Sequence, residues 1–132
     1  MSDTTKPRQL QLASAVTAPR MAREFLSDAC TAWEVEQFIE PGSLAVSELV
    51  SNAVLHAGTD LAVTLGLNGG RLVVRVHDDG DKLPEVGVRR ADTMTAGAGG
   101  LGLDIVARLA ESWGIDLDPE GGKSVWCVLR EQ

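Results

Sequence analysis

Residues 47–56 read Ser-Glu-Leu-Val-Ser-Asn-Ala-Val-Leu-His, and this stretch decides the fold that the sequence predicts. Apolar residues recur around it at the helical period and predict a buried stripe, formed by Val46, Leu49, Val50, Ala53 and Ala57. Glu48, Asn52 and His56 are four residues apart, so they lie one turn above another on a second face. On its own such a polar row is typical of a solvated helix face, and only its sequence context favours a site.

Length and composition favour one globular domain over residues 1–132, with residues 1–8 frayed. No apolar run has transmembrane length, and the polar N-terminus lacks the apolar core of a signal peptide, so we expect a cytoplasmic protein without a membrane partner. The net charge of -7 and the lack of a basic stripe argue against a nucleic-acid partner. Cys30 and Cys127 lack zinc or redox spacing and are expected to be buried, inert thiols.

The segments before the quoted stretch predict a strand and two helices. Alternation of leucine and glutamine over residues 9–12 predicts an edge strand. A helix follows Thr17, with a proline in its first turn. Pro41-Gly42 is expected to break the chain, so that the helix carrying the polar row runs from about Ser43 to the C-cap Gly58.

The segments after it begin with a hairpin, predicted from alternating residues 61–67 and 72–76 around Asn68-Gly69-Gly70. Asp78 continues the inward series of the second strand, so its carboxylate points to the covered side of the sheet and needs a partner there. Gly80 then allows backbone or ligand to approach closely.

The remaining segments are a long loop, a helix and two strands. Residues 84–100 lack periodicity, and glycines at their end open into a helix over residues 101–113 that Gly114 caps. A strand starts at Ile115, and residues 119–122 turn into a last, central strand through Val125, Cys127 and Leu129.

Two familiar glycine motifs do not fit their context. Residues 97–102 match the dinucleotide fingerprint G-x-G-x-x-G, but a polar loop precedes them instead of a strand. Gly122-Lys123-Ser124 looks like the tail of a P-loop, but the first glycine is missing and a strand follows. In the absence of other context, the default interpretation of Lys123 and Ser124 is that they are residues at a strand start.

The ordered set of boxes resembles the GHKL ATPase superfamily with its Bergerat fold, and within it the anti-sigma factor serine/threonine kinases of the RsbW and SpoIIAB type, including stand-alone actinobacterial regulators. The boxes are residues 47–56, residues 76–80 with Pro84, residues 100–106, and residues 113–114 with 122–126. The resemblance implies an α+β, two-layer sandwich, in which about three helices cover one face of a mostly antiparallel mixed sheet.

The same resemblance implies ATP and Mg²⁺ as cofactors and assigns roles to individual residues. Asp78 would accept a hydrogen bond from the adenine amino group, with no protein cation to neutralise it, while Ser124 would hold a bridging water. Asn52 would coordinate Mg²⁺. Gly80 would let the base lie against the backbone. The phosphates would be wrapped by Gly99, Gly100, Leu101 and Gly102.

Glu48 would be the general base, one helical turn from the metal. His56 either supports the site or stabilises the helix end. Arg89 and Arg90 either touch the γ-phosphate or a partner, or form a solvated pair, which is the default interpretation.

Three functions fit the resemblance. The first is a kinase that phosphorylates a STAS-domain anti-anti-sigma factor and binds a sigma factor. The second is a non-catalytic, nucleotide-dependent module that sequesters a sigma factor or another regulator through Trp33 and the loop over residues 83–98. The third is simple ATP hydrolysis. A homodimer is compatible with all three.

Overall fold

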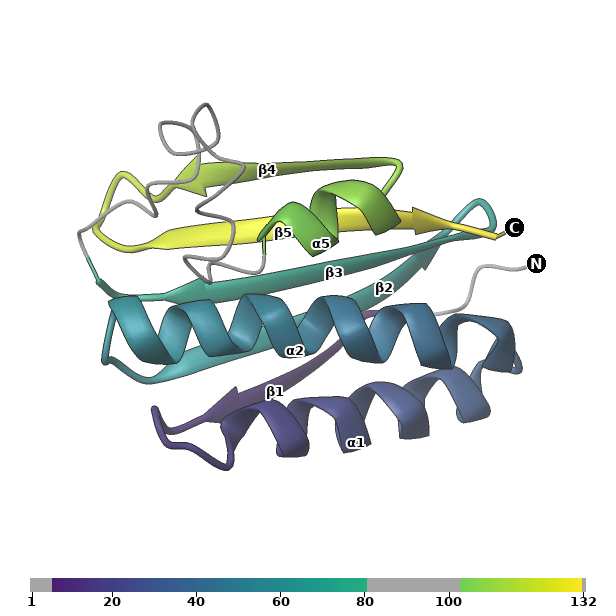
Figure 1. Cartoon of the computed structure of the whole chain (residues 1–132), viewed down its shortest axis with the longest axis horizontal. Coiled ribbons are helices and arrows are strands. Elements are labelled where there is room, and N and C mark those ends of the chain that lie inside the picture. The colour runs from purple at the N-terminus through teal and green to yellow at the C-terminus, as the bar shows by residue number, and fades with distance from the viewer. Residues whose placement is uncertain (1–5, 81–102, 132) are drawn as a thin grey trace.

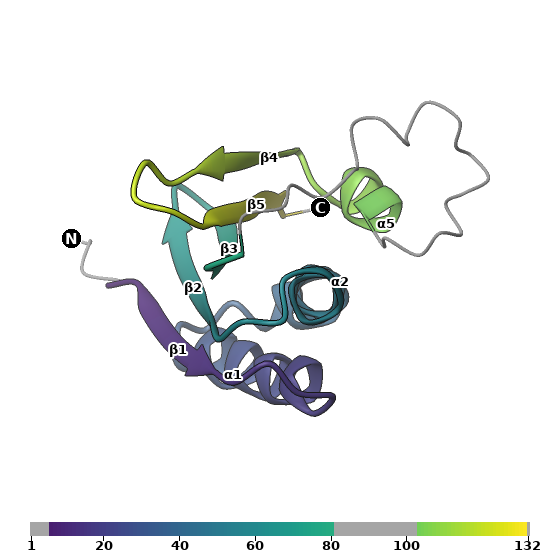
Figure 2. The same ribbon diagram turned by 90° about the vertical axis from the view of Figure 1, so that its left-hand side faces the viewer.

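The computed structural model describes residues 6–80 and 103–131. The elements in chain order are β1 (Arg8–Leu12), α1 (Ala18–Ala32), the 3₁₀ turn η1 (Glu36–Phe38), α2 (Ile39–His56), β2 (Leu61–Asn68), β3 (Arg71–Asp78), α5 (Leu103–Leu109), β4 (Ser112–Leu117) and β5 (Lys123–Arg130). They form two layers, in which α1, α2 and α5 cover one face of a five-stranded sheet (Figures 1 and 2). This confirms the predicted α+β sandwich.

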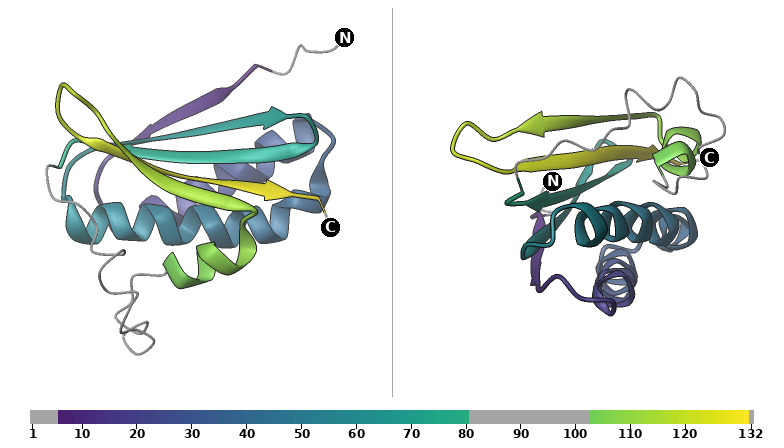
Figure 3. Two further views of the ribbon diagram at one scale, coloured as in Figure 1. Left: turned by 90° about the horizontal axis from the view of Figure 1, so that it is seen from above. Right: turned by 60° about the vertical axis from the view of Figure 1, so that its left-hand side comes forward.

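The strands are arranged in the order β1-β2-β3-β5-β4. β1 is an edge strand and β5 lies inside the sheet, as predicted. Each of the four ladders between described strands is antiparallel, so the sheet over these residues is not mixed. Among the described elements no helix covers the other face, as the two views of Figure 3 show.

The core lies between the sheet and helix α2, which runs between α1 and α5 across the layer (Figure 1). Four residues of the predicted stripe of α2 are buried, Val46, Leu49, Val50 and Ala53, whereas Ala57 is the C-cap and only partly buried. The inward residues of the hairpin and of β5 complete the core, and they include Leu65, Leu72, Val74, Val76, Cys127 and Leu129. Both cysteines are free and buried, as expected.

Helix α2 begins earlier than predicted, because Pro41 and Gly42 do not break the chain. The helix starts at Ile39, which places Pro41 in the first turn, where no intrahelical N–H donor is required. Gly42 allows the helix to approach its neighbours: a Cβ there would lie 3.1 Å from Leu26 and 3.2 Å from Leu72. The predicted end is confirmed, since Gly58 follows the C-cap with a φ of 69°.

The predicted helix over residues 101–113 is too long. Helix α5 ends at Leu109, and Trp113 and Gly114 belong to strand β4, opposite Cys127 and Trp126. A Cβ on Gly114 would lie only 2.7 Å from the indole of Trp126. Gly114 therefore makes room for that indole instead of capping a helix.

The N-terminal strand also begins earlier than expected. Arg8, predicted to be frayed, pairs with Leu65 in the first ladder. Its guanidinium lies 5.6 Å from the centroid of the Trp33 ring, a cation–π distance. None of the described helices combines the length and the apolar character needed to cross a bilayer.

Candidate functional site

The polar row of α2 is not a uniformly solvated face. Asn52 is only 7% exposed, whereas Glu48 is half-buried and His56 is exposed. The buried side-chain nitrogen of Asn52, Nδ2, has no hydrogen-bond partner among residues 6–80 and 103–131. An unsatisfied buried donor costs about 1–3 kcal/mol, so a hydrogen-bond acceptor from outside the described residues would be stabilising there.

Asp78 ends β3 on the helix-covered side, as the parity of the strand predicts, and it is 2% exposed. The expectation that no protein cation neutralises it is wrong. Lys123, itself 3% exposed, places Nζ 2.9 Å from Asp78 Oδ1. Asp78 and Lys123 are direct partners in the ladder between β3 and β5, so their side chains leave the same face of the sheet.

Lys123 lines the cavity and was not predicted as a site residue, although the sequence contained a signal for its position. Val125, Cys127 and Leu129 alternate along the last strand, and the same two-residue period extends back to residue 123.

Ser124 lies on the opposite face. Its Oγ lies 3.2 Å from Nδ1 of His77, which is also on that face, and His77 Nε2 lies 3.4 Å from Asp79 Oδ1. The structure does not bring Ser124 to Asp78.

Two glycines allow the chain to converge around Asp78. The Gly80 N–H donates to Asp78 Oδ1 at 2.9 Å, and a Cβ on Gly80 would lie 2.9 Å from the Cβ of Ala57 at the end of α2. Gly122 has a φ of 90°, and a Cβ there would lie 2.5 Å from the Asp78 carbonyl oxygen. Both positions therefore require glycine.

A small cavity joins these elements. Its volume is about 10 Å³, room for one water molecule. The residues that line it are Leu49, Asn52, Ala53, His56, Val76, Asp78, Lys123 and Val125. Three of the predicted polar residues, Asn52, His56 and Asp78, thus meet at one place. Predictions for Gly99, Gly100, Leu101, Gly102, Arg89 and Arg90 lie outside the described residues.

The residue types at the site are compatible with a nucleotide and its magnesium ion, and the cavity in this structure has room for one water molecule. Carboxamide groups such as that of Asn52 carry a hard oxygen, and Mg²⁺ is commonly held by one or two protein ligands together with phosphate oxygens. Within residues 6–80 and 103–131 no group of three or more His, Cys, Asp and Glu side chains could hold a metal by itself. The unpartnered Asn52 amide, the Gly80 cradle and the buried Asp78 are consistent with a ligand that brings its own polar atoms.

The cysteines take no part in this chemistry. Burial raises the pKa of Cys30 to about 11, with a smaller contribution from Glu36, and burial raises the pKa of Cys127 to about 12. Both thiols are therefore protonated and weakly nucleophilic at neutral pH.

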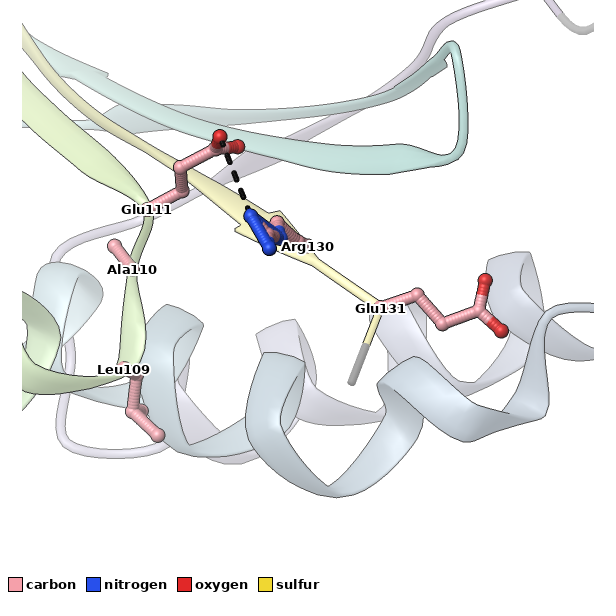
Figure 4. Close-up of a pocket in the computed structure, with 5 residues that line it drawn as sticks. All are labelled: Leu109, Ala110, Glu111, Arg130 and Glu131. Carbon is pink, nitrogen blue, oxygen red and sulfur yellow. Dashed lines mark ion pairs between the residues drawn. The ribbon is translucent and has the colours of Figure 1, made fainter.

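A larger hollow of about 320 Å³ lies at the other end of the sheet (Figure 4). Glu111 lines this hollow and accepts two hydrogen bonds from Arg71, at 2.6 and 3.2 Å. A guanidinium nitrogen of Arg130 lies 3.9 Å from Glu111 Oε2. The hydrogen bond between Arg71 and Glu111 lowers the pKa of Glu111 and raises the pKa of Arg71. Arg71 and Asp78 are the two ends of β3, so this paired and exposed cluster does not belong to the site around Asn52.

Comparison with known proteins agrees with the observed fold. Residues 42–132 match the family model of the histidine kinase-, DNA gyrase B- and HSP90-like ATPases. A solved structure of the RsbU and RsbW domains of Rv1364c from Mycobacterium tuberculosis is similar, with a TM-score of 0.66 and 22% identity over 96% of this chain. The chain spans 32% of the length of that protein. A search of curated protein sequences found no match.

Proposed function

The chain belongs to the histidine kinase-, DNA gyrase B- and HSP90-like ATPase family, and from this premise we propose that it is an ATP-binding regulatory protein with serine/threonine protein kinase activity. The observation that carries the proposal is the meeting of a buried, unpartnered Asn52 amide with the buried Asp78 in one cavity. Asp78 already pairs with Lys123, so the unsatisfied Asn52 nitrogen is the stronger of the two indications of a ligand.

The described residues divide the work of nucleotide binding. Asp78 accepts a hydrogen bond from the adenine amino group, and the absence of a side chain at Gly80 lets the base approach the backbone. Asn52 holds the triphosphate end through its carboxamide. Asn52 would hold Mg²⁺ through its carboxamide oxygen, and the ion would supply positive charge beside the phosphates.

Glu48 is the proposed general base. It is half-buried and one helical turn before Asn52, and no hydrogen bond or ion pair joins it to another described residue, so its carboxylate is available. It takes the proton of a serine or threonine hydroxyl as that oxygen bonds to the γ-phosphorus and the bond to the β-phosphate oxygen breaks. The products are ADP and a phosphorylated protein.

The acceptor is another protein. The resemblance to RsbW- and SpoIIAB-type kinases supports a STAS-domain anti-anti-sigma factor as the phosphorylated partner and a sigma factor as the second partner, both in the cytoplasm. His77 is not an acceptor candidate, because it lies within β3 on the outer face, beside Ser124.

The test is phosphoryl transfer from γ-labelled ATP to purified STAS-domain proteins in the presence of Mg²⁺. We expect Glu48→Gln to reduce transfer about 100-fold or more while ATP affinity stays near that of the wild type. Glu40→Gln is the matched control, because Glu40 is an exposed carboxylate on the same helix. Equal labelling by wild type and Glu48→Gln would refute the role of Glu48. ATP binding without any labelled partner would support a nucleotide-dependent binding module instead.

A further inference from the structure

The pair formed by Lys123 and Asp78 puts an ammonium group inside the pocket assigned to the base. Nζ donates to Asp78 Oδ1 at 2.9 Å, and the same oxygen accepts the Gly80 N–H. The side chains of the pair are only 4% and 3% exposed. A salt bridge this deeply buried differs from an exposed one, because solvent cannot replace either partner.

Both members of the pair have unused hydrogen-bonding capacity. An ammonium group carries three donors, and within the described residues Lys123 uses one of them, on Asp78. Asp78 Oδ2 accepts no hydrogen bond from a described residue. Because both side chains line the small cavity, a donor and an acceptor stand side by side at its wall.

We propose that Lys123 reads the nucleobase: its ammonium group donates a hydrogen bond to ring nitrogen N1 of adenine while Asp78 accepts one from the neighbouring 6-amino group. Adenine presents this acceptor and this donor on adjacent atoms of its Watson–Crick edge, which proteins read by hydrogen bonds. The inference rests on the proposed function, and it adds a specificity-determining residue to the same site.

Charge explains why Lys123 stays in the pocket when the base enters. The 6-amino group is neutral, so it can satisfy an oxygen of Asp78 but cannot compensate its negative charge. If Lys123 left, a buried carboxylate would face a neutral base. The cavity holds one water and a purine is larger, so side chains around the pair move apart on binding.

The test is calorimetric binding of two nucleotides, ATP and 1-deaza-ATP, in which a C–H group replaces N1 and removes the acceptor. Wild-type protein is expected to bind 1-deaza-ATP about 10- to 100-fold more weakly than ATP, the value of a hydrogen bond to a charged group. Lys123→Met, which keeps the length of the stem, should bind ATP more weakly by a similar factor and should no longer distinguish the two nucleotides. Lys6→Met, which changes an exposed lysine, is the control and should behave as wild type.

Each contrary result has its own meaning. Wild-type protein that binds no ATP would overturn the proposed function and this inference with it. Wild-type protein that binds both nucleotides equally would overturn the inference alone. Tighter ATP binding by Lys123→Met would also overturn it, because Lys123 would then be a plug that competes with the base. If Lys123→Met fails to fold, the comparison of the two nucleotides on wild-type protein still decides.

Discussion

The buried ion pair predicts a large loss of stability when its cation is removed. In Lys123→Met the carboxylate of Asp78 remains 2.9 Å from where the ammonium was, in a pocket to which water has almost no access. Breaking a buried pair by removing one partner costs about 3–5 kcal/mol. A domain of this size has roughly 5–15 kcal/mol in total, so the variant should unfold at clearly lower urea concentration.

The assay is equilibrium urea unfolding followed by tryptophan fluorescence, without nucleotide. The double variant Asp78→Asn/Lys123→Met removes both charges and is expected to recover most of the lost stability, because apolar or neutral replacement of a whole buried pair is close to neutral. A cost below about 1 kcal/mol for Lys123→Met would refute the reasoning, since that is the value of an exposed pair. Lys6→Met should leave the free energy of unfolding unchanged.

The other two predictions concern packing and thiol chemistry. Gly114→Ala should destabilise the protein by about 1–3 kcal/mol, because the new methyl would lie 2.7 Å from the Trp126 indole. Gly66→Ala in β2 is the control and should not destabilise the protein, because its methyl would meet nothing within 4 Å. Equal melting temperatures of the two variants would contradict the close contact. Cys30 and Cys127, with pKa values raised to about 11 and about 12, should react slowly with a disulfide reagent at about pH 8 until urea unfolds the chain, and rapid reaction of the native protein would contradict their burial. The raised pKa values also make stability depend on pH. The contribution of the neutral thiols to the free energy of unfolding is fully present below the unfolded pKa of about 8.5, and it is lost as pH rises toward the folded values.

Strong periodicity made much of the fold predictable. The apolar stripe of α2 and the alternation in the hairpin each leave one face that must be buried, and that fixes the register of the elements. Because a strand changes face at every residue, the inward position of Asp78 followed from the residues before it.

Local signals misled where tertiary contacts decide. Pro41-Gly42 is usually a chain break, but a first-turn proline and a glycine packed against Leu26 and Leu72 suit the start of a helix. Residues 110–114 continue a helical apolar spacing, yet pairing with β5 and the space needed by Trp126 make them part of a strand.

Individual residues of the candidate site were predictable from the sequence, but the ion pair between Asp78 and Lys123 was not. Glu48 and Asn52 follow from the helix period and Asp78 from strand parity. The partner of Asp78 depends on which strand lies beside β3, and sequence order does not give this, because β5 rather than β4 is the neighbour. Once the register is known, Lys123 follows directly.

The most direct test of the central claim is ATP binding by wild type and by Asp78→Asn, measured by calorimetry with Mg²⁺ present. The account predicts saturable binding of one ATP per chain by wild type, and affinity reduced about 10-fold or more in Asp78→Asn, because an amide accepts from the adenine amino group less strongly than a carboxylate. Binding of equal strength by both proteins would contradict the claim that the pocket at Asp78 holds the base.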